Sequence, residues 1–165
     1  MNPFFQLHSD LEREGPGDRA SLDWAFATGH VPRDARILDA GCGPGADIEG
    51  LLANAPEGHV TARDLHRAFI DRVNAVWGND PRVDAKVGSM SEPTGPFDLV
   101  WSAGSLYFLG VEEGLRHFRT RLAPGGVVAF SELAWLVDRP DPGLEWDMRK
   151  EYPQIGGQDT LQARV

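Results

Sequence analysis

The chain has 165 residues, the size of one domain, and its 41% hydrophobic and 25% charged residues are ordinary for a globular protein. Its formal net charge of −9 argues against a nucleic acid as the main partner, because phosphates need clustered Lys and Arg. No apolar run has the length of a membrane helix, and the N-terminus lacks a signal-peptide pattern. We therefore expect no membrane association and a cytoplasmic location.

Residues 1–33 are expected to form an N-terminal helical lid or cap. Asp18 can cap a helix that begins just after it. Two interpretations stay open for the segment before Asp18: a lid that keeps water out of a small-molecule site, or a short helix that packs on the domain. Its apolar helical face also includes one histidine, and the four residues on it are Phe4, Leu7, His8 and Leu11.

A strand, a glycine turn and a helix follow. Residues 37–40 read as the end of a buried strand, and the turn is Gly41-Cys42-Gly43-Pro44-Gly45. Gly41 and Gly43 lack a Cβ atom, so the backbone can turn sharply and approach a ligand closely. The helix after the turn presents unsatisfied N–H groups at its start. This combination predicts the first unit of a nucleotide-binding α/β sheet.

The turn alone leaves the nucleotide open. Gly41-x-Gly43-x-x-Ala46 satisfies the dinucleotide fingerprint, and Asp64 lies 21 positions after Gly43, where an acid that binds a ribose is expected. Arg63 could read the 2′-phosphate of NADP. Asp64 fits the ribose of any nucleoside, and it could also cap the next helix.

Strands and helices alternate along the rest of the chain, which predicts an α/β domain with a parallel sheet. Further strands are expected at residues 59–63, 83–87, 96–104 and 127–130, with helices near 65–77 and 111–122 and a turn at 122–126. Beyond residue 137 the pattern fails, and a loop precedes one short helix at residues 144–151.

The segment Leu38-Asp39-Ala40-Gly41-Cys42-Gly43-Pro44-Gly45 resembles the first motif of the class I S-adenosylmethionine-dependent methyltransferases. Four more segments resemble motifs of that family and follow in its order. They are Asp64, Gly88-Ser89-Met90, Phe97 to Gly104 and Pro124-Gly125-Gly126. Each segment alone is weakly specific, whereas the ordered set over roughly residues 34–136 points to this family.

The resemblance implies a Rossmann-like doubly wound sheet, mostly parallel, with strand order 3-2-1-4-5. Within a single domain, the α/β core would span residues 34–136, and a C-terminal loop and short helix would span 137–165. The implied cofactor is S-adenosylmethionine, with S-adenosylhomocysteine as product, and no metal is expected. The residues that the resemblance assigns to the cofactor are Asp39, Ala40, Gly41, Cys42, Gly43, Asp64, Leu65, Ser89, Met90, Ser102 and Ala103.

The sequence departs from the family in two places. Ser89 stands where the family often has an acid that reaches the adenine amino group, although a hydroxyl can still form a hydrogen bond there. The chain also ends before the family's strands 6 and 7, so we expect a short form that lacks this hairpin. Strand five would then be an exposed edge, through which a homodimer could form.

A methyltransferase mainly has to align an acceptor atom with the electrophilic methyl group. The expected acceptor is a small molecule that presents an O, N, C or S nucleophile. Candidates for a base or an orienting group are Tyr107, Glu132 and His8, whereas Cys42 is expected to pack under the turn. Two alternatives remain: a non-catalytic cofactor-binding or structural fragment, and an NAD(P)-dependent oxidoreductase. The second needs a hydride-transfer partner such as a Tyr-x-x-x-Lys pair, which the sequence lacks.

Overall fold

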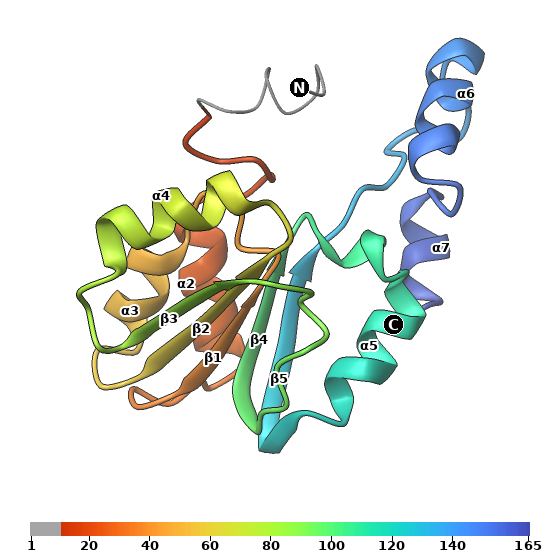
Figure 1. Cartoon of the computed structure of the whole chain (residues 1–165). Coiled ribbons are helices and arrows are strands. Elements are labelled where there is room, and N and C mark those ends of the chain that lie inside the picture. The colour runs from red at the N-terminus through yellow and green to blue at the C-terminus, as the bar shows by residue number, and fades with distance from the viewer. Residues whose placement is uncertain (1–10) are drawn as a thin grey trace.

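The computed structural model describes residues 11–165 and contains a five-stranded sheet (Figure 1). The strand order is β3-β2-β1-β4-β5 and every neighbouring pair is parallel, which confirms the expected α/β fold and strand order. The strands are β1 (Arg36–Ala40), β2 (His59–Asp64), β3 (Val83–Val87), β4 (Phe97–Ala103) and β5 (Leu122–Ser131).

Helices cover both faces of the sheet, and successive residues of β1 serve the two sides. Ile37 packs in one core with α2, α3 and α4, whereas Leu38 packs in the other with η1 and α5 (Figure 1). The central strand is therefore buried on both faces, as a doubly wound sheet requires. The helices are α2 (Arg19–Thr28), α3 (Ile48–Asn54), α4 (Arg67–Trp77), η1 (Leu106–Phe108), α5 (Val111–Arg119), α6 (Pro142–Glu151) and α7 (Gln158–Gln162).

The segment before α2 is not helical where the structure describes it. Residues 11–18 are irregular, with bends at residues 12 and 14–16, so the predicted helical face is wrong at Leu11. The rest of that face, including His8, lies outside the described residues. Asp18 caps α2 as predicted, because its carboxylate accepts hydrogen bonds from the Ser21 amide at 2.8 Å and the Ser21 hydroxyl at 2.7 Å.

β5 begins at Leu122, five positions earlier than the predicted residue 127, and α5 ends at Arg119 rather than near 122. The pairing with β4 shifts between Phe97, opposite Leu122, and Leu99, opposite Val127. The predicted turn is thus an irregularity inside a strand. Only glycine fits at position 126, because a Cβ atom there would lie 2.6 Å from the Phe97 carbonyl oxygen, which is too close.

The chain after β5 is more structured than the sequence indicated. α6 starts at Pro142, where the Asp141 carboxylate accepts hydrogen bonds from the amides of the next turn. α7 was not predicted. Tyr152 and Ile155, between the two helices, are buried and anchor a segment from which α6 projects away from the sheet (Figure 1). Within residues 11–165, no helix has the length and apolar character needed to cross a membrane.

Candidate cofactor and acceptor site

A cavity of about 910 Å³ opens at the carboxyl ends of β1, β2 and β4. Its walls come from residues 13–16, the glycine turn, the loops after β2 and β3, and the segment through η1. In an open parallel sheet this is the edge at which ligands bind, where the strand order switches between β1 and β4.

The glycine turn has the backbone that its residues predict. Gly41 and Gly43 have φ angles of +74° and +51°, in the left-handed region that glycine tolerates. The amides of Gly41 and Cys42 both donate to the Arg63 carbonyl oxygen, at 2.9 and 3.1 Å, which ties the turn to β2. A Cβ atom on Gly41 would lie 2.5 Å from the Ser105 hydroxyl, so the turn needs glycine there.

Asp64 lies on the cavity wall and is held by two backbone amides. One carboxylate oxygen accepts from Gly43 N at 3.0 Å and the other accepts from His66 N at 2.7 Å. His66 is the N-cap residue of α4, so Asp64 fixes the entry to that helix without being its cap. The contacts orient the carboxylate at the turn while its side chain still lines the cavity.

Three carboxylates lie close together under the turn. Asp39 is 3% exposed, and one of its carboxylate oxygens has no hydrogen-bond partner. Burial, followed by the charges of Asp47 and Asp64, raises the pKa of Asp39 well above its ordinary value. Asp47 accepts a 2.9 Å hydrogen bond from the Trp101 indole and forms an ion pair with Arg13. The hydrogen bond to Asp47 is the main reason that the pKa of Arg13 is raised.

Residues 13–16 form an N-terminal strap along the cavity. A Cβ atom on Gly15 would lie 2.6 Å from the Ala103 carbonyl oxygen, and Pro16 lies against Gly104. The strap therefore runs directly along the end of β4. Sequence reasoning anticipated a lid but missed Arg13, Glu14 and Asp47 as cavity residues. Asp47 could have been found from the sequence, because it lies two residues after the glycine turn, whereas nothing in the sequence marks Arg13 or Glu14.

Most of the residues assigned to the cofactor line the cavity: Asp39, Gly41, Cys42, Gly43, Asp64, Leu65, Ser89, Met90 and Ala103. Ala40 and Ser102 are buried beneath the cavity wall and do not line it. The Ser102 hydroxyl instead lies 2.8 Å from the Ser105 hydroxyl, which donates to the Ala40 carbonyl oxygen at 2.5 Å. Ala40 and Ser102 therefore support the glycine turn from beneath the cavity wall.

Cys42 lines the cavity with little exposed surface, and burial raises the pKa of its thiol, so the thiol stays protonated. This agrees with a packing role. Tyr107 also lines the cavity, and its ring packs at a tilt against the Tyr152 ring, with the ring centres 5.2 Å apart.

Glu132 follows β5 and does not line the cavity. One carboxylate oxygen accepts from Leu133 N at 2.9 Å, and the other is buried without a partner. Burial raises the pKa of Glu132. Burial, with the charge of Glu132, also raises the pKa of Tyr107. The structure thus brings two of the predicted catalytic residues near each other, and the third, His8, lies outside the described residues.

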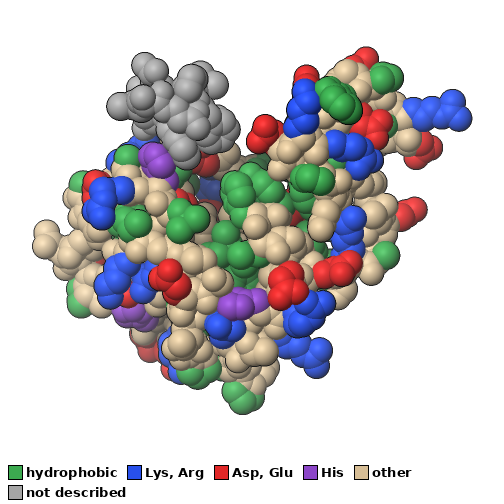
Figure 2. All heavy atoms as spheres, turned by 45° about the vertical axis from the view of Figure 1, so that its right-hand side comes forward, with side chains coloured by type: hydrophobic (Ala, Val, Ile, Leu, Met, Phe, Trp, Pro, Cys, Tyr) green, Lys and Arg blue, Asp and Glu red, His purple; other side chains and the backbone are tan. Residues whose placement is uncertain are grey.

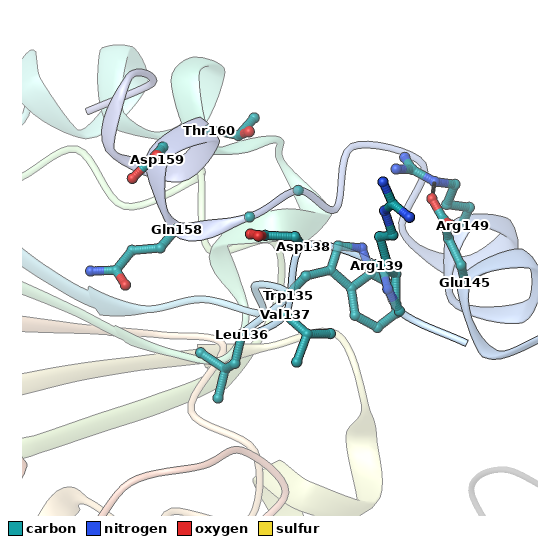
Figure 3. Close-up of a pocket in the computed structure, with 13 residues that line it drawn as sticks. Trp135, Leu136, Val137, Asp138, Arg139, Glu145, Arg149, Gln158, Asp159 and Thr160 are labelled. Atoms are coloured by element: carbon teal, nitrogen blue, oxygen red, sulfur yellow. Dashed lines mark hydrogen bonds and ion pairs between the residues drawn. The ribbon is translucent and has the colours of Figure 1, made fainter. Parts of the chain in front are cut away.

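A second cavity of about 690 Å³ lies between the chain that follows β5 and the helices α6 and α7. Figure 3 shows Trp135, Asp138 and Arg139 around it, with Arg149 paired to Glu145 at 2.9 Å. Of the described residues that the sequence predicted to act on cofactor or acceptor, none lines this second cavity. Among residues 11–165 no cluster of His, Cys, Asp or Glu could hold a metal ion.

Comparison with known proteins identifies the family. Residues 38–128, more than half of the chain, match the family described as "Methyltransferase domain". The chain belongs to this methyltransferase family. It is 33% identical over 133 residues to a malonyl-[acyl-carrier protein] O-methyltransferase of Enterobacter lignolyticus, covering 80% of this chain and 50% of that protein. It is 30% identical over 132 residues to a trans-aconitate 2-methyltransferase of Methylobacterium nodulans, covering 79% and 48%.

The chain therefore spans about half the length of the curated relatives that it matches. Among solved structures, an S-adenosylmethionine-dependent methyltransferase of Thiobacillus denitrificans in complex with S-adenosyl-L-homocysteine superposes with a TM-score of 0.78 at 19% identity. That comparison covers 99% of this chain and 68% of the other. At this identity the superposition establishes the methyltransferase fold.

Proposed function

We propose that this methyltransferase-family chain uses S-adenosylmethionine to methylate a small molecule at an O, N, C or S nucleophile. The observation that carries the proposal is the Asp64 carboxylate, fixed on Gly43 N at the mouth of the glycine turn. A carboxylate held there can accept hydrogen bonds from both hydroxyls of a ribose. The fold of the Thiobacillus denitrificans protein, which holds S-adenosyl-L-homocysteine, supports the choice of nucleoside.

The residues of the cavity fit this cofactor. Asp39 offers a buried carboxylate oxygen that lacks a partner, which suits the amino group of the methionine portion. Met90 and Leu65 line the wall near Asp64 and suit a flat adenine ring. Gly41 and Gly43 leave space beside the turn. A Cβ atom on Gly41 would overlap Ser105, and one on Gly43 would strain the backbone at its positive φ angle.

NADP fits less well, because its 2′-phosphate needs a free cation beside Asp64. Arg63 is the neighbouring cation, but its guanidinium is bound to Asp84 through the carboxylate at 2.9 Å and the carbonyl oxygen at 2.8 Å. Because these contacts hold the guanidinium against β3, Arg63 joins two strands and is not available to bind a phosphate. The NADP-dependent form of the oxidoreductase alternative therefore lacks its phosphate reader, and both the NAD- and the NADP-dependent forms lack the hydride-transfer partner in the sequence.

When bound, the cofactor supplies a methyl group made electrophilic by a sulfonium. The chain then has to hold the acceptor in line with that methyl group and exclude water. Tyr107 lines the cavity on the acceptor side, where its hydroxyl can orient the acceptor atom. A base is needed only for an acceptor that is not already nucleophilic, and the candidates are His8, outside the described residues, and Glu132, which lies near Tyr107 but does not line the cavity. Turnover of Tyr107→Phe, Glu132→Gln and His8→Ala tests the set, and unchanged rates in all three would reject it.

We also propose a cytoplasmic location and pairing of two copies through β5. β5 is an edge strand of the described sheet, and an edge strand offers unpaired backbone groups to another chain. Light scattering at high protein concentration tests this: a monomer throughout would count against the dimer.

The test of the cofactor is calorimetric titration with S-adenosylhomocysteine. Asp64→Ala should weaken binding by at least about tenfold, the size of a lost charge-assisted contact. Asp71→Ala, an exposed aspartate on α4, is the matched control and should bind normally. Equal binding by both variants would contradict the assignment of Asp64. Binding without methyl transfer to any acceptor would favour the non-catalytic alternative.

A further inference from the structure

The main cavity has a charged end and an uncharged end. All the Asp, Glu, Lys and Arg side chains in its described lining come from the strap, β1, the N-cap of α3 or the end of β2. They are Arg13, Glu14, Asp39, Asp47, Arg63 and Asp64. The proposed cofactor contacts use these residues and the loops after β2 and β3, which leaves the described lining that follows Ala103 for the acceptor.

That wall is aromatic and aliphatic. Tyr107, Phe108, Leu109 and Leu133 line it, and among these only Tyr107 carries a polar side-chain group. Phe108 is 70% exposed, although its ring lies only 4.1 Å from the Tyr107 ring. Leu136, three residues after Leu133, is 91% exposed and lines the second cavity. Figure 2 shows hydrophobic side chains gathered on this face of the molecule.

The charges around the site disfavour an anionic acceptor. The lining carries the four carboxylates and two guanidiniums named above, on a chain of net charge −9. Arg139 and Arg149 line the second cavity instead (Figure 3). Arg164 donates to the Gln154 carbonyl oxygen at 2.7 Å and does not line the main cavity. Among the residues that the structure describes, the two guanidiniums of the lining are already paired, Arg13 with Asp47 and Arg63 with Asp84, so an acceptor carboxylate at the apolar wall would be desolvated without a Lys or Arg beside it.

We infer that the acceptor is an uncharged aromatic compound whose ring lies against Phe108 and Tyr107. The inference rests on the proposed function for the location of the methyl group, but the wall itself belongs to the chain. Two neighbouring rings, one of them largely exposed, offer the tilted and offset contacts that aromatic ligands favour. Phe108 is then a residue that determines specificity, and the Tyr107 hydroxyl is the polar group that orients the acceptor atom.

The experiment compares two probes that differ in charge, 2-naphthol and 2-naphthoate, by calorimetric titration with and without saturating S-adenosylhomocysteine. We expect 2-naphthol to bind and 2-naphthoate to bind at least about tenfold more weakly. Phe108→Ala should weaken 2-naphthol binding by about fivefold, because one ring contact is lost, and leave the S-adenosylhomocysteine affinity unchanged. Trp24→Ala removes another exposed aromatic ring, 68% exposed on α2 and outside the cavity lining, and should change neither affinity.

Equal or tighter binding of 2-naphthoate would overturn the inference, as would an absence of binding by both probes or a Phe108→Ala variant that binds like the parent chain. If the apolar wall instead contacts a second copy of the chain, light scattering will show a dimer that Phe108→Ala disrupts, and 2-naphthol will not bind. Failure of the proposed function looks different: S-adenosylhomocysteine would not bind, while the preference for 2-naphthol in its absence would persist and uphold the aromatic wall.

Discussion

Arg13 and Asp47 join the N-terminal strap to the glycine turn through a two-pronged ion pair. One guanidinium nitrogen donates to a carboxylate oxygen at 3.0 Å and the second donates to the other oxygen at 2.5 Å. Trp101 donates to the same carboxylate from β4, at 2.9 Å. Three separate parts of the chain therefore meet at one mostly buried carboxylate beside the cavity.

Asp47→Asn should lower the free energy of unfolding by about 1–2 kcal/mol, because a partly buried guanidinium loses its charged partner. Urea unfolding followed by tryptophan fluorescence measures this. Glu113→Gln, which breaks the exposed pair between Glu113 and Arg116 on α5, is the control and should cost no more than about 0.5 kcal/mol. Equal losses in the two variants would show that the strap contact adds nothing.

Gly41→Ala and Gly43→Ala should differ although both residues have positive φ angles. A Cβ atom on Gly43 would lie 3.6 Å from Glu14, so this variant bears only backbone strain of about 1 kcal/mol. At Gly41 the Cβ atom would overlap Ser105, which adds about 1–3 kcal/mol. Denaturant midpoints of the two variants provide the measurement, and similar midpoints would contradict the close approach of Ser105.

Asp39→Asn should stabilise the protein at pH 7 to 8 by on the order of 1 kcal/mol, at the expense of binding. Because the pKa of Asp39 is raised in the folded state, the folded protein binds more protons than the unfolded chain between the unfolded and folded pKa values. Stability contributed by Asp39 therefore falls as pH rises through that window. The gain from the variant should shrink toward pH 4 and vanish below it.

Unfolding measured at pH 4 and pH 7.5 checks the Asp39 prediction, with S-adenosylhomocysteine titrations alongside. A variant that is less stable than the parent chain at pH 7.5 would show that Asp39 is not under electrostatic stress.

Gly15→Ala should displace the strap from β4, because its Cβ atom would lie 2.6 Å from the Ala103 carbonyl oxygen. We expect S-adenosylhomocysteine affinity to fall about tenfold, with little change in stability, since the strap lines the cavity rather than the core. Gly143→Ala is the control: its Cβ atom would meet only the Asp141 side chain at 3.2 Å, on the distant α6. Unchanged affinity in Gly15→Ala would mean that the strap does not contribute to the site.

Local patterns were sufficient to predict the five strands, although not the start of β5, whereas the strand order came from the family resemblance. A few residues are enough to identify a buried strand such as residues 37–40, or the glycine turn that follows it. The order of these segments along the chain indicated the family. The site prediction was less accurate because successive side chains of a strand point to opposite faces of the sheet. Asp39 reaches the cavity lining, but its neighbour Ala40 packs beneath it, and a motif assigns both without distinguishing them.

Contacts between distant segments could not be predicted in the same way. Arg13 and Asp47 are 34 positions apart, and nothing in the local sequence of the strap indicates that Arg13 folds back onto the turn. Tyr152 lies beyond residue 137, where the sequence shows no clear pattern of strands and helices. It is nevertheless buried against Tyr107, because the chain between α6 and α7 returns to the domain. Tertiary packing decided both positions.

The central claim is that the glycine turn binds the nucleoside of S-adenosylmethionine. The most direct test is calorimetric titration of the protein with S-adenosylhomocysteine, with NADH and NADPH titrated in parallel. We expect S-adenosylhomocysteine alone to bind, and its binding to be weakened in Asp64→Ala. Binding of a nicotinamide cofactor instead, or of none of the three, would contradict it.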